Sequence, residues 1–189
     1  MNEEELKAYL ASSGAFLDGH FLLSSGLHSP NYVQCALALK DPARAGRMGA
    51  ALAAGWKGPK PDVIVSPAMG GLIIGHEVAR AFGVEFIFTE RENNVMTLRR
   101  GFTLARGAAV IVVEDVFTTG KSTLETDEVV RRHGASTVGA MSVIDRTGGK
   151  SFPFPTASLL KLALTALPAA ECPLCKAGVP VVKPGSRKF

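Results

Sequence analysis

The fold is decided by the stretch Val110-Ile111-Val112-Val113-Glu114-Asp115-Val116-Phe117-Thr118-Thr119-Gly120-Lys121-Ser122-Thr123. Four β-branched apolar residues in a row, 110 to 113, predict a strand that is buried on both faces. From 124 to 132 charged residues alternate with apolar ones at helical spacing. The stretch is therefore a strand that runs into a loop, and the loop opens a helix.

This loop has the composition of an anion site. Residues 118–123 place hydroxyls, a lysine and successive backbone N–H groups at a helix N-terminus, where unpaired donors and the helix dipole favour a phosphate. Just before it, Glu114 and Asp115 stand at the carboxyl end of the strand, where two carboxylates suit ribose hydroxyls or a hard cation. A nucleotide-binding P-loop is excluded, because that motif needs glycine where this chain has Asp115. The alternative is a solvated acidic pair before an ordinary turn. It is disfavoured because an apolar run, an acidic pair and a hydroxyl-rich turn follow one another here.

The same stretch closely resembles the phosphoribosyl-pyrophosphate (PRPP) signature of the type I phosphoribosyltransferases. The resemblance implies that Glu114 and Asp115 contact the ribose 2′- and 3′-hydroxyls and that the loop from Thr118 to Ser122 wraps the 5′-phosphate. The implied PRPP site comprises Glu114, Asp115, Val116, Phe117, Thr118, Thr119, Gly120, Lys121, Ser122 and, farther along the sheet, Arg91. Glu114, Asp115 and Arg91 are the expected catalytic residues.

Bulk properties favour one globular domain. The chain has 189 residues, 47% of them hydrophobic, a mean hydropathy of +0.19, a net charge of +4 and a pI near 9.1. Its basic residues are mostly scattered, so no stripe for nucleic acid is expected. The acidic start lacks the apolar core of a signal peptide, and the longest apolar segment, 157–167, is too short for a bilayer. We therefore expect a cytoplasmic protein without a membrane or nucleic-acid partner.

Periodicity predicts an α/β fold. Helices are expected at about 3–13 and at 43–56, 72–82 and 124–132, and strands at 21–23, 32–35, 62–66, 84–88, 110–114, 136–144 and about 158–164. Alternating strands and helices imply right-handed parallel crossovers and a Rossmann-like parallel sheet. We predict a single phosphoribosyltransferase domain over residues 1–189, with its core at about 41–150. A small hood is expected from about 1–40, possibly joined by the tail at 151–189.

Residues 89–100 are polar and charged and lack a clean period. They are interpreted either as a mobile lid over the carboxyl edge of the sheet or as a solvated hairpin. Residues 102–105 are a candidate for one more strand.

The PRPP signature names the donor substrate but not the acceptor. Two further resemblances indicate which acceptor base is used. The segment Phe21 to Pro30 resembles the N-terminal part of orotate phosphoribosyltransferases, and Val143-Ile144-Asp145-Arg146 resembles the strand end whose arginine holds orotate there. The resemblance covers about residues 14–150. It implies transfer of ribose 5-phosphate from PRPP to orotate, with Mg²⁺ held mainly through PRPP, no direct protein ligand to it, and a homodimer. The orotate site would comprise Thr118, Arg146, Ser25 and Gly26. From the residues alone, Arg146 is as readily a solvated or locally paired arginine.

Three lysines of the family pattern are missing. The hood lysine is Ser24, the turn lysine is replaced within 69–71, and the lysine-rich lid is replaced from 90 onward. The cations available for pyrophosphate are Arg91, Arg99, Arg100, Lys121 and His28, and the choice among them stays open. If Arg91 or the Arg99–Arg100 pair acts across a dimer interface, the lid serves the partner's site. His20, His76 and His133 are expected to be structural or superficial.

Two other functions and one metal site remain as alternatives. A purine phosphoribosyltransferase would keep the loop but not need Arg146, and an RNA-binding regulator of the same fold would show a basic dimer face. Cys172 and Cys175 have the spacing of one zinc knuckle, but a structural site needs four ligands and only Cys35 is left. Either two chains share a zinc ion, or the cysteines are reduced thiols in a terminal turn.

Overall fold

The body of the molecule is a six-stranded sheet with the strand order β5-β4-β3-β6-β7-β8. The computed structural model describes residues 1–23 and 25–184. The strands are β3 (Val63–Pro67), β4 (Glu85–Glu92), β5 (Val95–Leu98), β6 (Ala109–Phe117), β7 (Ser136–Asp145) and β8 (Thr156–Lys161). All neighbouring strands are parallel except β4 and β5. The predicted Rossmann-like parallel sheet is confirmed, with one antiparallel edge strand added.

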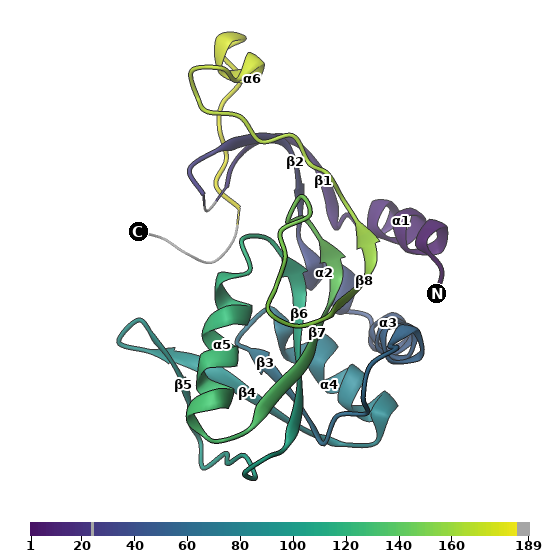
Figure 1. The fold of residues 1–189 in the computed structure, drawn as a ribbon. Coiled ribbons are helices and arrows are strands. Elements are labelled where there is room, and N and C mark those ends of the chain that lie inside the picture. The colour runs from purple at the N-terminus through teal and green to yellow at the C-terminus, as the bar shows by residue number, and fades with distance from the viewer. Residues whose placement is uncertain (24, 185–189) are drawn as a thin grey trace.

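Helices cover both faces of this sheet (Figure 1). On one face lie α3 (Pro42–Gly55) and α4 (Gly71–Phe82), and on the other lies α5 (Lys121–Arg132). Successive residues of β6 point to opposite faces, so Ile111 and Val113 join the core beneath α3 and α4, while Val110 and Val112 join the core beneath α5. These four side chains are fully buried, as the apolar run predicted. Burying both faces in this way fixes the register of the strand that carries the acidic pair.

The helix starts follow the sequence signals. Asp41 caps α3 by accepting from the N–H groups of Ala43 and Arg44, at 2.9 and 3.2 Å, with Pro42 in the first turn. Asn2 caps α1 (Glu3–Ser12), and Glu5 completes the capping box. No helix among the described residues is long and apolar enough to cross a membrane.

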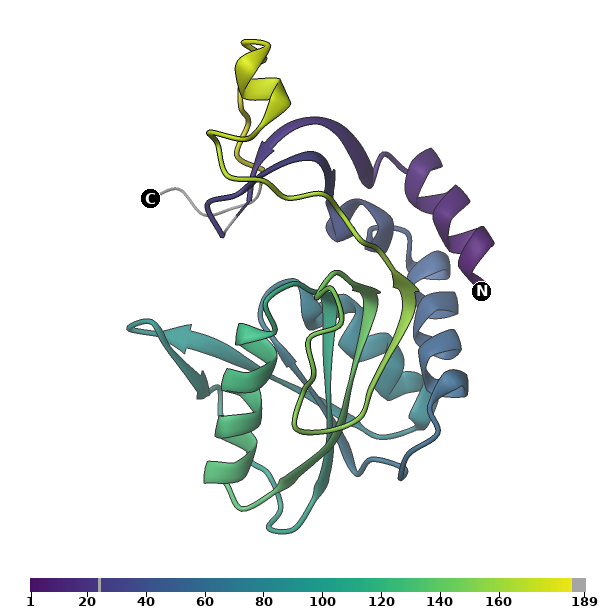
Figure 2. The ribbon, with the colours of Figure 1, turned by 45° about the horizontal axis from the view of Figure 1, so that its top comes forward.

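A hood stands above the carboxyl edge of the sheet (Figure 2). Its hairpin consists of β1 (Phe16–Leu22) and β2 (His28–Val33), followed by α2 (Cys35–Leu39). The tail returns to this hairpin: Leu167 pairs with His28, Val182 pairs with Phe21, and α6 (Pro173–Lys176) lies between the two bridges. The tail thus pairs with the hood hairpin at two places.

Several expected boundaries are wrong. The strand expected at 32–35 ends at Val33, and Cys35 begins α2, because burying Ala38 and Leu39 favours a helical turn. Residues 102–105 form no strand; Phe102 and Leu104 instead pack as a loop against the core beneath α5. The helix α5 begins at Lys121, earlier than expected, and β1 begins at Phe16. Ser24 lies outside the described residues.

Candidate active site

The point where the strand order reverses lies between β3 and β6. From β3 the chain moves outward to β4, whereas from β6 it moves the other way to β7 and β8. The loops that follow β3 and β6 therefore flank a crevice position at the carboxyl edge of the sheet, where open α/β sheets bind their ligands.

Each of these two loops opens a helix whose N-terminus has no side-chain cap. The N-cap residues are Gly70 for α4 and Gly120 for α5, and neither offers a capping hydrogen bond. Among the first-turn N–H groups, that of Lys121 donates to Thr119 Oγ1 at 3.4 Å and that of Leu72 to Met69 O at 3.2 Å. Both helix dipoles still present their positive ends to an anion at this edge. The α5 site was predicted from the sequence. The α4 site was not, because its only signal is a pair of glycines.

The acidic pair joins these two helix ends. Glu114 and Asp115 are neighbours on β6, so their side chains point to opposite faces. A Cβ atom placed on Gly70 would lie 2.7 Å from an Asp115 carboxylate oxygen, so Asp115 faces the α4 loop. Glu114 faces α5, where a hydrogen bond with the Ser122 side chain tends to lower its pKa.

Burial dominates the electrostatics of both carboxyls. Glu114 is 8% exposed, and desolvation together with the charge of Asp115 raises its pKa well above the ordinary value. Desolvation also raises the pKa of Asp115, against an opposing hydrogen bond from the Val116 N–H at 2.8 Å. Groups that donate hydrogen bonds or positive charge to this pair would relieve the desolvation, which is what ribose hydroxyls and a developing cation offer.

Arg146 is held at the same edge. Its backbone N–H donates to Phe117 O at 2.8 Å. This bond ties the end of β7 to the end of β6, directly before the loop at 118–122, which is called the phosphate loop below. Its side-chain Nε is buried without a hydrogen-bond partner among the described residues, and burial lowers its pKa. A buried, unpaired guanidinium nitrogen is costly, so the site is suited to an anionic ligand that arrives from solution.

Two hood residues complete this corner, and sequence reasoning missed both. Tyr32 is close enough to Asp115 and Arg146 for both charges to act on its pKa, which burial raises first of all. The Cys35 Sγ contacts Asp115 O at 4.0 Å. Neither residue carries a motif, since each reaches the site only through the folding of the hood.

The phosphate loop is also contacted by the segment between β7 and β8. Lys150, which sequence analysis did not select, donates from Nζ to Thr119 O at 2.7 Å. A Cβ atom on Gly120, whose φ is 73°, would lie 2.7 Å from the Phe152 ring. Glycine is thus required at the turn into α5, both for its left-handed backbone and for this close approach.

The segment 89–100 is a hairpin of β4 and β5, with Asn93 and Asn94 at positive φ in its turn. Arg91 Nη1 lies 3.3 Å from Glu125 Oε1 of α5, and its Nη2 forms a closer contact with the same carboxylate. Lys121 reaches that carboxylate at 3.8 Å. Arg91 therefore stands next to the phosphate loop of its own chain.

The other expected contacts are farther out in the structure. Arg99 and Arg100 form ion pairs with Glu90 and Glu92 within the hairpin. Ser25 and Gly26 are exposed at the tip of the hood hairpin, and their contact with orotate stays a prediction. His28 is wrong as a pyrophosphate cation: it is 9% exposed and lies 2.7 Å from His20, inside the hood.

Comparison with known proteins agrees with this geometry. The family model described as a phosphoribosyl transferase domain matches residues 44–159, which span β3 to β7, both helix ends and Arg146. The chain therefore belongs to the phosphoribosyltransferase family.

Within this family, the chain is similar over most or all of its length to orotate phosphoribosyltransferases. An orotate phosphoribosyltransferase of Pelotomaculum thermopropionicum is 47% identical over 190 residues, with 100% of both chains covered. One from Caldanaerobacter subterraneus is 50% identical over 172 residues, covering 90% of each chain. The crystal structure of orotate phosphoribosyltransferase from Aeropyrum pernix has a TM-score of 0.65 and 25% identity, covering 83% of this chain and 93% of its own.

Proposed function

We propose that this protein transfers ribose 5-phosphate from PRPP to N1 of orotate, giving orotidine 5′-monophosphate and pyrophosphate in pyrimidine biosynthesis. The observation that carries the proposal is Arg146, whose buried Nε has no hydrogen-bond partner in the described part of the chain and lies at the same sheet edge as the phosphate loop. A carboxylate on the acceptor base satisfies a guanidinium fork, and a purine offers none. The full-length likeness to orotate phosphoribosyltransferases supports the same substrate.

PRPP has two anionic ends, and the chain has two open helix ends to receive them. The 5′-phosphate goes to the N-terminus of α5, at residues 118–122, and the pyrophosphate goes to the N-terminus of α4, at 69–71. The ribose then lies between them, against Glu114 and Asp115. This arrangement replaces the missing turn lysine with backbone N–H groups, and Arg91 beside α5 is the nearest lid cation to the phosphate loop.

The difficult step is cleavage of the C1–O bond, which places positive charge on the ribose and negative charge on pyrophosphate. Glu114 and Asp115 stabilise the positive charge, and the helix N-termini with Arg91 stabilise the leaving group. Magnesium, when bound with PRPP, supplies further neutralisation of the pyrophosphate oxygens. The carboxylate oxygens of Glu114 and Asp115 are of the hard kind that suits such an ion, but the two side chains point to opposite faces of the sheet and form no joint ligand set, so the ion would be held mainly through PRPP.

The direct test is an absorbance assay of orotate consumption with and without PRPP. We expect orotate to be consumed only when PRPP is present, with one pyrophosphate released per orotate. Uracil, adenine and hypoxanthine are the comparison acceptors. Turnover of a purine in preference to orotate would overturn the proposal.

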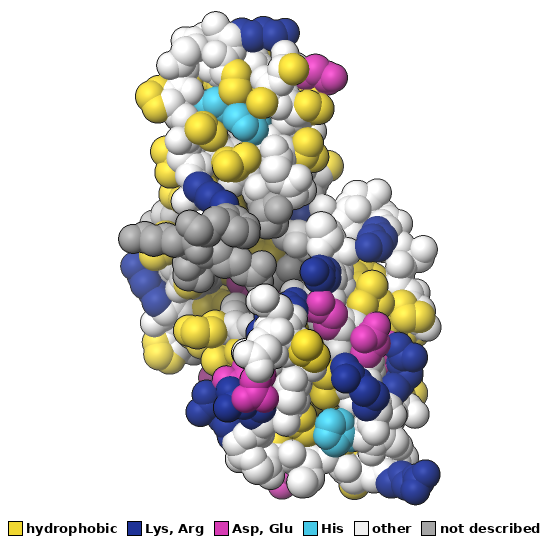
Figure 3. All heavy atoms as spheres, turned by 90° about the vertical axis from the view of Figure 1, so that its left-hand side faces the viewer, with side chains coloured by type: hydrophobic (Ala, Val, Ile, Leu, Met, Phe, Trp, Pro, Cys, Tyr) yellow, Lys and Arg dark blue, Asp and Glu magenta, His cyan; other side chains and the backbone are white. Residues whose placement is uncertain are grey.

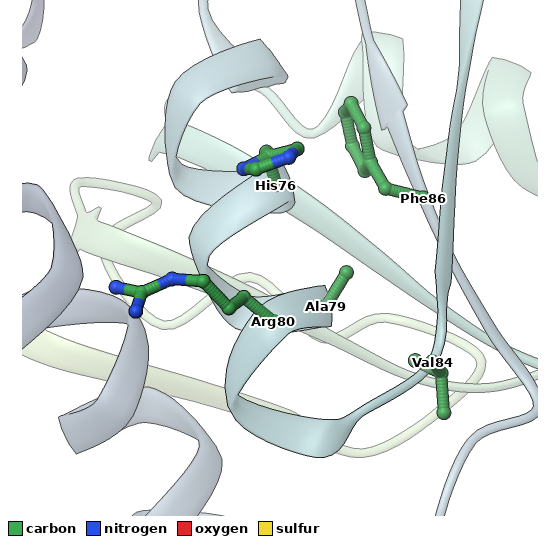
Figure 4. A pocket seen from close by; sticks show the side chains of 5 residues that line it. All are labelled: His76, Ala79, Arg80, Val84 and Phe86. Atoms are coloured by element: carbon green, nitrogen blue, oxygen red, sulfur yellow. The ribbon is translucent and has the colours of Figure 1, made fainter.

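A homodimer is part of the proposal, and an apolar face between α4 and β4 supports it. Ile73 is 46% exposed there. Next to it the surface is hollowed between His76 and Phe86 (Figure 4). Exposed apolar area of this kind marks association sites. Because β4 also carries Arg91, a second copy seated on this face would lie beside the lid.

Mixed dimers decide whether the lid acts across the interface. Arg91 contacts its own α5, so Arg91→Ala chains are expected not to rescue Asp115→Asn chains, since every site would keep one defect. A chain with both Arg99 and Arg100 changed to alanine would rescue Asp115→Asn chains if that pair serves the partner. Activity recovered with Arg91→Ala would instead place Arg91 in the partner's site. A monomer by sedimentation under assay conditions would end the homodimer proposal.

We also assign the reaction to the cytoplasm. The three cysteines, Cys35, Cys172 and Cys175, form no disulfide with one another, as expected in a reducing compartment. Fractionation of cells with an antibody to the chain tests this assignment.

A further inference from the structure

Four metal-binding side chains converge in the hood, away from the substrate site. They are His20 on β1, His28 at the start of β2, and Cys172 and Cys175 around α6. Their ligand atoms all lie within 4.8 Å of one another. We infer that one chain binds a structural zinc ion through His20 Nε2, His28 Nδ1 and the two cysteine sulfurs.

The distances between the ligand atoms fit a tetrahedral ion. Bonds of about 2.0 Å to nitrogen and 2.3 Å to sulfur place neighbouring ligand atoms about 3.3–3.8 Å apart. His20 Nε2 lies 3.5 Å from Cys172 Sγ and 3.6 Å from Cys175 Sγ, and His28 Nδ1 lies 3.2 Å from Cys175 Sγ. The two histidine nitrogens are 2.7 Å apart, so metal binding requires them to separate by about 0.6 Å.

A backbone carbonyl orients the His20 ring. Its Nδ1 lies 2.7 Å from the carbonyl oxygen of Val179, and a carbonyl can only accept a hydrogen bond. In the neutral ring this contact places the proton on Nδ1, and Nε2 then directs its lone pair at the other three ligands. A backbone carbonyl that orients a histidine in this way is typical of metal sites.

The cluster is buried, which distinguishes it from a chance group of polar side chains on the surface. His20 and Cys172 are each 3% exposed, and Cys175 is half-buried. Histidine atoms are visible among apolar side chains in the upper part of the surface shown in Figure 3. A closed site with four protein ligands and no room for substrate is structural and not catalytic.

The tail also needs such a link. Val179, Val181 and Val182 are 40%, 46% and 55% exposed, so apolar burial holds this segment weakly. A small unit with little core is usually stabilised by a disulfide or a metal ion. The sequence suggested a knuckle at Cys172 and Cys175 shared between two chains; the structure supplies the two missing ligands, His20 and His28, from the same chain. The expectation that His20 is merely structural or superficial missed this role.

Metal content tests the inference directly. We expect full-length protein, purified reduced and without chelator, to contain one zinc per chain by elemental analysis. Cys172→Ser, Cys175→Ser and His20→Gln should each lose it, whereas Cys35→Ser and His76→Gln, a buried cysteine and a histidine outside the cluster, should retain it. No zinc in the wild-type protein, or full zinc in the cluster variants, would overturn the inference.

Cobalt provides a second readout that does not depend on the variants folding. Wild-type protein stripped of metal and reloaded with Co²⁺ should show the visible bands of a tetrahedral ion and the charge-transfer absorption of two thiolates. An octahedral spectrum without thiolate absorption would refute the site. Half a zinc per chain would replace the single-chain site by one shared between chains, and a Cys172–Cys175 disulfide that persists through purification under reducing conditions would exclude the metal.

The metal and the proposed function can fail separately. Zinc without orotate turnover would refute the activity and keep the site, and turnover in protein that never binds zinc would do the reverse. Where both hold, zinc links His20 and His28 at the end of the hood hairpin that carries Ser25 and Gly26, so stripping the metal should raise KM for orotate more than KM for PRPP.

Discussion

Replacing Arg146 with alanine is the perturbation with the clearest expected result. The guanidinium lies partly buried at the end of β7, with Nε unpaired among the described residues. In the proposed function the carboxylate of orotate becomes the partner, and removing the arginine would leave that carboxylate desolvated and unpaired. Breaking such a pair from one side costs about 2–4 kcal/mol. This corresponds to a loss of about 30- to 900-fold in kcat/KM for orotate.

The assay is steady-state kinetics with each substrate varied in turn. The loss should fall on KM for orotate and spare KM for PRPP, since the proposal assigns the Arg146 guanidinium to the acceptor carboxylate and not to the phosphate groups. Arg146→Lys keeps the charge but not the fork and should lie between the wild type and the alanine variant. Arg132→Ala, at the far end of α5, is the matched control and should behave as wild type. Equal effects on both substrates, in a variant with wild-type Tm, would refute the reasoning and leave Arg146 a scaffold residue.

Three further predictions concern residues at the carboxyl edge of the sheet. Asp115→Asn should lower kcat by about 100-fold or more with an unchanged fold by circular dichroism, because the amide keeps the shape but not the charge; near-normal turnover would exclude the role. The raised pKa of Glu114 means that the folded chain binds this proton more tightly than the unfolded chain, so stability without ligand should fall as pH rises from the ordinary carboxyl range through the raised pKa. Glu114→Gln should flatten that decline in Tm, and an unchanged slope would contradict it. Gly70→Ala should weaken PRPP binding by about 1–3 kcal/mol, because its Cβ meets the Asp115 carboxylate at 2.7 Å, whereas Gly55→Ala, with nothing within 4 Å, should not; equal PRPP affinity in the two variants would argue against the packing.

The parts of the site that were predictable are those that follow one another in the chain. The structure of the run from Val110 to Ser122 could be predicted, because a strand buried on both faces, an acidic pair and a helix start are all local sequence patterns. Asp41-Pro42 likewise predicted the start of α3. In each case the residues that decide the conformation are within a few positions of it.

The parts that were missed depend on tertiary contact. Tyr32 and Cys35 reach Asp115 only because the hood folds over the sheet, and Cys35 was placed in a strand when the packing of Ala38 and Leu39 makes it helical. The His20–Cys172 contact joins positions 152 apart. Spacing along the chain cannot reveal such a cluster, so the cysteines pointed to a metal while its other ligands went unnoticed.

The return of the tail to the hood has a consequence for the order of folding. During synthesis β1 and β2 leave the ribosome first, yet the residues that pair with them, around 167 and 182, emerge only after the entire sheet. A two-stranded hairpin alone is marginally stable in water. The sheet can thus fold early and present its phosphate loop, while the hood becomes ordered late. A nascent chain would therefore present its phosphate loop and Arg146 before the hood that carries Ser25 and Gly26 is in place.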